Sequence, residues 1–356
     1  MSVKGLKVAV VGATGAVGHE LLLSLKKRNF PVNDLVLFAS SRSEGKKVEW
    51  GGKTYSCQVL RKGCFDGVDL AFFDASDAIS KEWVPQAAES GAWVVDNSAA
   101  FRMEKDIPLV VPEVNGSLVG AKLKSLKQVQ PRDRIFTGPN CSAAPLSVAL
   151  KPIRDLWGIR RVVVSTYQST SGAGTLAMAE LTDQTQAVLN GSPARSSIFP
   201  HRIAFNCIPH IGGFKEDGYT GEEHKIVEET QKMLDLPDLK ISVTAVRVPT
   251  LSCHALTVNV ECEKQVNPDH LREVFSKSAG VILQDRPQDK IYPMGMTFEG
   301  DPVEGASGND AVYIGRIRRD PTLGSGLNLW IVADNLRKGA ALNAIQVAEV
   351  LLKAIH

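Results

Sequence analysis

The sequence predicts a two-domain α/β protein, in which a parallel sheet covered by helices precedes an α+β domain with a mainly antiparallel, open sheet. Three observations support this fold class. The chain has 356 residues, more than the roughly 250–300 that one hydrophobic core normally serves. Its first 140 residues alternate β-rich runs with helical stretches. From about residue 158, strongly alternating runs are joined by longer connections rich in Gly and Pro.

The strands of the first domain are apolar on both faces, as expected for a parallel sheet with helices on each side. The expected strands are 7–11, 34–40, 68–75, 93–99 and one that ends at Thr137, with helices from about Val17 and near 77–90.

The second domain is expected to build its sheet from three alternating runs, 160–170, 239–249 and 254–262. A last segment, 335–355, has apolar residues at helical spacing, and we expect it to pack back onto the first domain. The predicted domains are therefore residues 1–140 plus 336–356, and residues 141–335.

Composition excludes several partners. Lys and Arg number 41 against 39 Asp and Glu, a net charge of +2. The sequence contains no run of five like charges, so its charge pattern does not indicate binding to nucleic acid or to an anionic membrane. The apolar stretch before Gly12 is too short for a signal peptide or a membrane span, so a cytoplasmic protein is expected. The six cysteines lack CxxC pairing and suggest reduced thiols. Cys207 and His210 have CxxH spacing but no second ligand pair, so no metal site is expected.

A Gly-rich turn follows the first strand and opens a helix. Glycines there let a pyrophosphate approach the backbone, and the helix N-terminal N–H groups face its charge. The turn predicts a Rossmann-type dinucleotide site, with a purely structural turn as the alternative. Its candidate cofactor-binding residues are Gly12, Thr14, Gly15, Ala16 and Val17.

The end of the second strand favours NADP over NAD. An NAD-binding fold usually carries an Asp or Glu there, but this chain has Ser40, Ser41, Arg42 and Ser43. An arginine and three hydroxyls can hold a 2′-phosphate through charge-assisted hydrogen bonds. A solvated turn with a surface arginine is the alternative.

Cys141 is the best nucleophile candidate. It follows a strand and begins an expected helix, whose dipole stabilises a thiolate and whose N–H groups can receive a developing oxyanion. A cysteine is nevertheless more often buried structure than catalyst. His254 is the most plausible proton-transfer partner, although six other histidines compete for that role.

Seven motifs occur along the chain in this order: GATGAVG, ASSRSEGK, GPNCSA, TYQSTSGAG, GEEHK, RVPTLSCH and DNLRKGAALNAIQVAE. Together they resemble those of aspartate-semialdehyde dehydrogenases, in a match that spans Val8 to Glu349. The resemblance implies an NADPH-dependent reduction of aspartyl 4-phosphate to aspartate 4-semialdehyde with release of phosphate, in the pathway to lysine, threonine and methionine. It also implies a homodimer, and a homotetramer of such dimers stays open.

The same resemblance assigns roles to single residues. Cys141 is implied as the nucleophile, His254 as acid/base, and Gln168 as the residue that orients the substrate. Phosphate would be held by Arg102, Asn140 and Lys225, the α-carboxylate by Arg247 and the α-ammonium by Glu222. Ser171, Gly172 and Asn335 are implied as further cofactor contacts. Glu223 rivals Glu222, and an intrahelical ion pair between Glu222 and Lys225 is an alternative.

Two positions depart from the family pattern, since Gly138 replaces an Asn and Cys253 precedes His254. Gly138 is expected to alter only the local backbone, and Cys253 is either a bystander or an oxidation liability. N-acetyl-γ-glutamyl-phosphate reductase is the nearest enzyme alternative, but it would not need an ammonium partner such as Glu222. A glyceraldehyde-phosphate type enzyme fits the motifs poorly. A non-catalytic relative would be expected to lose the nucleophile, the base or the cofactor turn.

Overall fold

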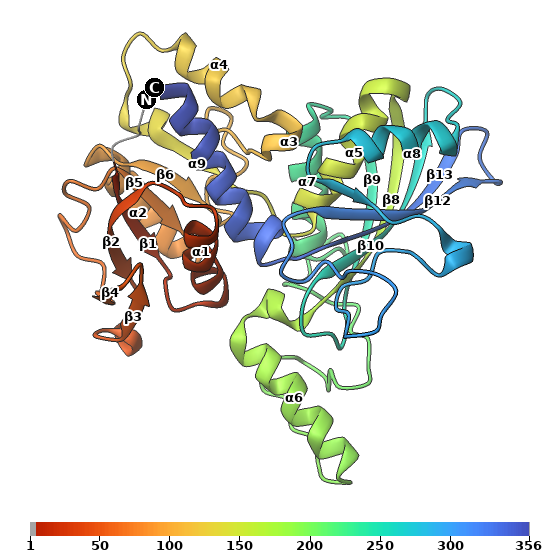
Figure 1. Cartoon of the computed structure of the whole chain (residues 1–356), viewed down its shortest axis with the longest axis horizontal. Helices are drawn as coiled ribbons and strands as arrows, with labels where there is room; N and C mark the ends of the chain where they lie inside the picture. Colours follow the sequence, from red (N-terminus) through yellow and green to blue (C-terminus); the bar gives the residue numbers. More distant parts are fainter. Residues whose placement is uncertain (1–4, 356) are drawn as a thin grey trace. The chain divides into compact units, whose positions relative to one another are not determined.

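The computed structural model describes residues 5–355. The chain divides into two compact units, Met1–Pro139 with Ala340–His356, and Asn140–Gly339 (Figure 1). Each unit has its own sheet and its own helices, as the predicted fold class requires. Among the described residues, no helix combines the length and apolarity needed to cross a membrane.

The first unit contains a five-stranded sheet in the order β2-β1-β5-β6-β7. All of its pairings are parallel, which confirms the predicted parallel sheet. A separate antiparallel hairpin, β3 (Lys47–Trp50) and β4 (Lys53–Ser56), was not predicted. The sheet strands are β1 (Leu6–Val11), β2 (Val32–Phe38), β5 (Leu70–Phe73), β6 (Trp93–Asp96) and β7 (Ile135–Thr137).

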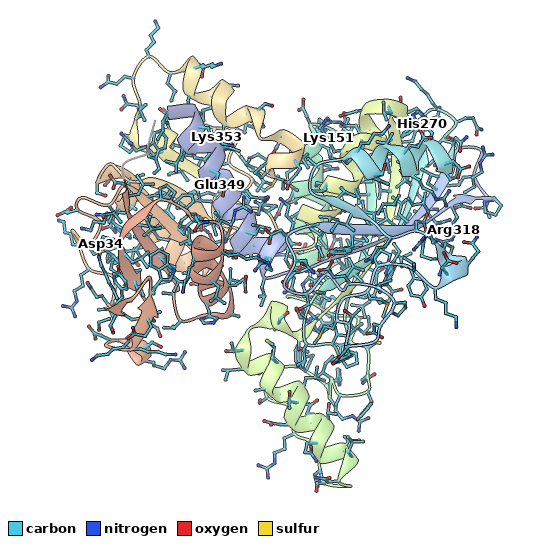
Figure 2. The ribbon with its side chains drawn as sticks, viewed as in Figure 1. Asp34, Lys151, His270, Arg318, Glu349 and Lys353 are labelled. Atoms are coloured by element: carbon cyan, nitrogen blue, oxygen red, sulfur yellow. The ribbon has the colours of Figure 1, made fainter. Side chains whose placement is uncertain are left out.

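Helices cover both faces of this sheet. Apolar residues of α1 and α9 join one core cluster, and those of α2 join the other. The C-terminal helix α9, which carries Glu349 (Figure 2), thus packs within the first unit. Its Glu349 pairs with Arg28 of the same unit at 2.7 Å. The helices are α1 (Ala16–Lys27), α2 (Asp77–Glu89), α3 (Pro112–Asn115), α4 (Ser117–Ser125) and α9 (Leu342–Ile355), with 3-10 turns η1 (Ser41–Ser43) and η2 (Pro131–Arg134).

The second unit contains a six-stranded sheet in the order β11-β12-β13-β10-β8-β9. Its three inner pairings are antiparallel and its two outer pairings are parallel. This agrees with the predicted, mainly antiparallel sheet. Its strands are β8 (Ile159–Gln168), β9 (Lys240–Arg247), β10 (His254–Cys262), β11 (Val281–Leu283), β12 (Val312–Asp320) and β13 (Gly326–Ala333).

Helices α5, α7 and α8 pack beside this sheet, and α6 extends away from it (Figure 1). The predicted C-terminal helix starts later than expected, because a π-helical segment, Arg337–Ala341, precedes α9. The helices are α5 (Ala143–Trp157), α6 (Thr175–Leu189), α7 (Gly221–Leu234) and α8 (Pro268–Lys277), with 3-10 turns η3 (Thr170–Ala173) and η4 (Pro287–Asp289).

Candidate active site

Sheet register places three of the predicted site residues in one row. In the second unit, Gln168 of β8 pairs with Arg247 of β9 on one side and with His254 of β10 on the other. Residues directly opposite each other on neighbouring strands have their side chains on the same face. All three side chains are buried. The row therefore brings together a cation, an amide and an imidazole from segments far apart in the sequence.

The His254 side chain is completely buried and neutral. Its Nδ1 accepts a hydrogen bond from the backbone N–H of Ser169 at 3.1 Å. Because that N–H can only donate, Nδ1 carries no proton and the neutral ring carries its proton on Nε2. Within the described residues, Nε2 has no hydrogen-bond partner. Burial and the neighbouring Arg247 charge lower the pKa of His254 to about 3.

Arg247 supplies a buried positive charge beside the imidazole. Its Nη1 donates to the carbonyl oxygen of Ser169 at 2.6 Å, so the backbone of one residue, Ser169, contacts both Arg247 and His254. Burial lowers the pKa of Arg247, while the nearby Cys141 and Glu222 act in the opposite direction. Among the described residues, no carboxylate lies within salt-bridge distance of this guanidinium. A buried cation without a close counter-ion is suited to bind an anionic group.

Cys141 lies in the loop before α5, within electrostatic range of Arg247. The expectation that N–H groups at the start of this helix receive an oxyanion is wrong for Ser142 and Ala143. Both of these N–H groups donate to Oδ1 of Asn140, at 2.8 and 3.2 Å. Asn140 thus caps the helix locally. The Nε2–H of His254, which has no partner among the described residues, is a donor that an oxyanion could use instead.

The structure distinguishes the two rival glutamates at the start of α7. Glu223 forms a capping box with Thr220 and also accepts the backbone N–H of Ala245 at 2.9 Å. Its carboxylate is therefore committed to the backbone. Glu222 instead accepts from Nδ2 of Asn140 at 2.8 Å and from Nε2 of Gln168 at 3.3 Å. Glu222 is the carboxylate that reaches the row of site residues.

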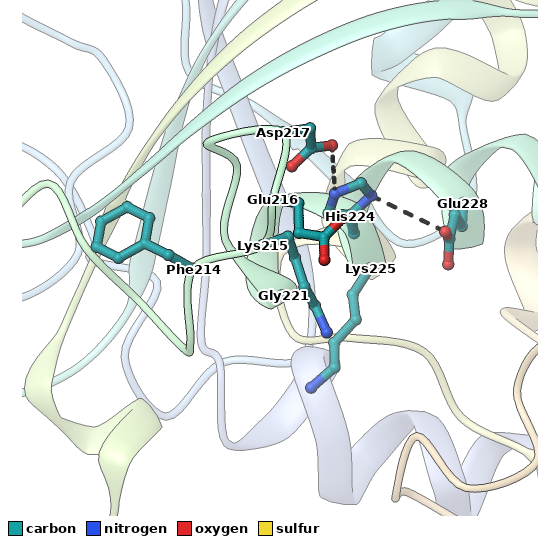
Figure 3. A pocket seen from close by; sticks show the side chains of 8 residues that line it. All are labelled: Phe214, Lys215, Glu216, Asp217, Gly221, His224, Lys225 and Glu228. Atoms are coloured by element: carbon teal, nitrogen blue, oxygen red, sulfur yellow. Dashed lines mark ion pairs between the residues drawn. The ribbon is translucent and has the colours of Figure 1, made fainter.

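Lys225 lies one helical turn after Glu222 and lines a pocket of about 790 Å³ (Figure 3). No ion pair joins it to Glu222 among the described residues, so the intrahelical alternative is not observed. The carboxylates of Asp217 and Glu228 face His224 instead, at 2.9 and 4.0 Å. The Lys225 ammonium is therefore available to an anion entering the pocket.

The loop after Gln168 contributes a small hydroxyl network. The side chains of Ser169 and Ser171 both donate to Oδ1 of Asn335, at 3.2 and 3.0 Å. Gly172 lies so close to the row that an added Cβ would be 2.9 Å from Nη1 of Arg247 and 3.1 Å from Nε2 of His254. Sequence reasoning missed Ser169, although it directly follows Gln168 in the same motif.

In the first unit, the Gly-rich turn has the form that a dinucleotide requires. Gly12 has φ +92°, and a Cβ there would lie 2.1 Å from the carbonyl oxygen of Asp74. A Cβ on Gly18 would lie 2.2 Å from the carbonyl oxygen of Gly12. No side chain caps the start of α1, so its first N–H groups can face a pyrophosphate. The residue types present fit a pyridine dinucleotide.

The turn after β2 fits the phosphate-bearing end of such a cofactor. Ser40 precedes η1, which consists of Ser41, Arg42 and Ser43. The Arg42 side chain is exposed, and no carboxylate pairs with it among the described residues. Its guanidinium can therefore reach a 2′-phosphate.

Arg102 is buried at the carboxyl edge of the parallel sheet. Its Nη2 donates to the carbonyl oxygen of Asn97 at 2.5 Å, and its charge acts on Asp74 and Asp96. Loss of hydration raises the pKa of Asp74 to about 7, and the nearby Asp96 acts in the same direction. Sequence reasoning missed these two carboxylates, although Asp74 directly follows β5 and Asp96 ends β6. The Arg102 charge is therefore shared with acidic neighbours.

The remaining thiols lie in settings unlike that of Cys141. Burial raises the pKa of Cys253 to about 12 and that of Cys262 to about 11, and Cys57 is also buried. Cys253 donates its proton to the carbonyl oxygen of Gly295 at 3.4 Å, which agrees with the bystander alternative. Cys207 is exposed. No group of His, Cys, Asp and Glu that could hold a metal ion occurs in the described part of the chain.

Comparison with known proteins gives similarity along almost the whole chain. Residues 7–121 match the family described as "Semialdehyde dehydrogenase, NAD binding domain", and residues 150–338 match "Semialdehyde dehydrogenase, dimerisation domain". An aspartate-semialdehyde dehydrogenase of Aquifex aeolicus is 48% identical over 351 residues, 98% of either chain. One from Legionella pneumophila is 45% identical and covers 97% of this chain and 95% of its own. The crystal structure of aspartate semialdehyde dehydrogenase II complexed with ASA from Vibrio cholerae has a TM-score of 0.90 and 43% identity, covering 99% of each chain.

Proposed function

Because this chain belongs to the aspartate-semialdehyde dehydrogenase family, we propose that it reduces L-aspartyl 4-phosphate to L-aspartate 4-semialdehyde with NADPH and releases phosphate. The observation that carries this proposal is the row of Arg247, Gln168 and His254, with Cys141 in electrostatic range of its arginine. A nucleophile, an orienting amide and a proton-bearing imidazole on one scaffold suit acyl transfer.

Cys141 acts as the nucleophile. Its thiolate attacks the carbonyl carbon of the acyl phosphate, the carbon–oxygen bond to phosphate breaks, and a thioester forms on Sγ. The positive charge of Arg247 favours the thiolate form of Cys141. Arg102, Asn140 and Lys225 bind the phosphate group, which leaves as the free ion.

Three side chains orient the amino-acid part of the substrate. Arg247 binds the α-carboxylate, because it is a buried cation without a close carboxylate. Glu222 binds the α-ammonium, and Gln168, which contacts Glu222 at 3.3 Å, holds the acyl group beside Cys141. Holding both charged ends fixes the direction of attack.

His254 acts as the proton donor. Its Nε2–H donates to the acyl oxygen as negative charge develops there, and Ser169 keeps the ring in the required tautomer. When bound, NADPH would supply a hydride to the thioester carbon. The carbon–sulfur bond to Cys141 then breaks, the hemithioacetal proton returns to His254, and the aldehyde leaves as the thiolate is restored. The cofactor would be held by the turn Gly12–Val17, by Ser40, Ser41, Arg42 and Ser43, and by Ser171, Gly172 and Asn335. The exposed Arg42 supports NADP over NAD.

The second unit also supports a homodimer. On the opposite face of its sheet, a pocket of about 620 Å³ is lined largely by apolar side chains, among them Tyr167, Phe298 and Trp330. Phe298 is 78% exposed, and the matched family describes this region as a dimerisation domain. A second copy would bury this face. We place the enzyme in the cytoplasm, in the pathway to lysine, threonine and methionine.

Nicotinamide absorbance tests the proposed reaction. Purified protein is mixed with aspartate 4-semialdehyde, phosphate and NADP, beside a Cys141→Ala control. We expect NADP reduction that needs phosphate and is lost in the control. Reduction with N-acetylglutamate semialdehyde alone would assign the protein to the related reductase instead. No reduction with either aldehyde would leave a non-catalytic protein with the same fold.

A further inference from the structure

The backbone of Gly339 lies directly against the proposed nucleophile. Gly339 is buried. A Cβ built on it would be 2.9 Å from Cβ of Cys141 and 3.1 Å from both the Cα and the carbonyl oxygen of Cys141. Real Cβ atoms essentially never approach other heavy atoms closer than 3.0 Å. Any side chain at position 339 would therefore displace Cys141.

A π-helical segment carries Gly339 to this position. The N–H of Gly339 donates to the carbonyl oxygen of Asp334 at 3.2 Å, a bond between residues five apart. The Asp334 carboxylate anchors the segment, because it accepts the backbone N–H groups of Leu336 at 2.9 Å and Gly308 at 2.8 Å. Asp334 directly follows Ala333, which pairs with His254 across β13 and β10. The strand pair that holds His254 thus also sets the position of Gly339.

Cys141 directly follows Asn140, whose position is fixed by hydrogen bonds. The Asn140 N–H donates to Glu229 at 2.5 Å, and the Asn140 side chain donates to Glu222 at 2.8 Å. Cys141 therefore follows a fixed residue in the chain and also packs against the backbone of Gly339. This leaves little freedom for the peptide that carries the thiol.

We propose that Gly339 is a positioning residue for the nucleophile, and that its missing side chain lets the π-helical segment hold Cys141 within the field of Arg247. Its importance for turnover rests on the proposed function, but its contact with Cys141 does not. π-Helical turns inserted into helices occur frequently at functional sites. Small displacements of reacting groups can cost large factors in rate.

Alkylation of Cys141 tests this proposal without turnover. Iodoacetamide labelling of the full chain is followed over a range of pH, and peptide mass spectrometry separates Cys141 from the exposed Cys207. For Gly339→Ala we expect the Cys141 alkylation rate to fall about tenfold or more, with a higher apparent thiol pKa. The matched control is Gly324→Ala, where an added Cβ meets no heavy atom within 4 Å. The control should alkylate at the wild-type rate.

A second pair of variants separates positioning from a general loss of stability. Cys141→Gly removes the Cβ that Gly339→Ala would meet at 2.9 Å. We expect Gly339→Ala to lower the Tm of the wild type more than that of the Cys141→Gly protein. An alkylation rate equal to wild type in Gly339→Ala, or an equal Tm loss in both backgrounds, would overturn the proposal. If Gly339→Ala lowers the Tm more in the wild type than in the Cys141→Gly protein, but the wild type has no dehydrogenase activity, only the proposed function would be refuted.

Discussion

Replacement of His254 by asparagine should remove much of the acid sensitivity of this protein. The histidine is completely buried, and burial together with Arg247 lowers its pKa from 6.5 to about 3. Asparagine stays neutral at all pH values in this range, and its side-chain oxygen can still accept the Ser169 N–H that now binds Nδ1. The substitution thus changes a titrating group into a neutral one with little change in hydrogen bonding.

The sign and size of the effect follow from proton linkage. Above pH 6.5 the imidazole is neutral in both the folded and the unfolded chain, so it adds no pH dependence. Below pH 6.5 the unfolded chain takes up a proton that the folded protein excludes, and the free energy of unfolding falls. The loss reaches about 2 kcal/mol at pH 5 and about 5 kcal/mol once the pH is below 3.

Urea unfolding at pH 7.5 and pH 5 measures this difference. Both proteins lose stability from their shared carboxylates, but the wild type should lose about 2 kcal/mol more than His254→Asn. The control is His201→Asn, at an exposed histidine, which should keep the wild-type pH dependence. Equal losses for wild type and His254→Asn would show that His254 is not held neutral, and would refute the described tautomer.

Four further substitutions test other parts of the site. Thr220→Ala removes the N-cap of α7 and should lower the free energy of unfolding by about 1 kcal/mol in urea; an unchanged midpoint would contradict the capping role. Glu222→Gln should raise the KM for aspartate semialdehyde about tenfold with an unchanged Tm. Glu223→Gln should lower the Tm, because it breaks the backbone contacts of that carboxylate. The reverse pattern would show that Glu223 binds the substrate and that Glu222 has the structural role. Arg42→Ala should raise the KM for NADP about tenfold and leave the KM for NAD unchanged, and an equal rise for both cofactors would remove Arg42 from 2′-phosphate recognition.

Local patterns in the sequence predict the first sheet well. Its strands are continuous apolar runs, and the turn after β1 needs Gly12 because a side chain there would meet Asp74. The capping box of Thr220 and Glu223 was also present in the sequence. That signal alone would have left Glu222 as the carboxylate available to the substrate.

Long-range pairing explains what could not be predicted. The row of Arg247, Gln168 and His254 depends on the register of three strands, and a slip of one residue would turn any of these side chains to the opposite face. Local apolar spacing does not encode that register. The π-helical segment was missed for a related reason, since its residues continue the helical periodicity of α9. The Asp334 carboxylate that anchors the segment also accepts the N–H of Gly308, a long-range contact that local spacing does not encode.

The central claim is that Cys141 carries the acyl group during the reaction. Intact-protein mass spectrometry tests it directly, after incubation with aspartate 4-semialdehyde and NADP in the absence of phosphate. The wild type should gain the mass of one aspartyl acyl group on Cys141, phosphate should remove it, and Cys141→Ala should gain nothing. NADP reduction without any acyl adduct in the wild type, or an adduct that persists in Cys141→Ala, would contradict the claim.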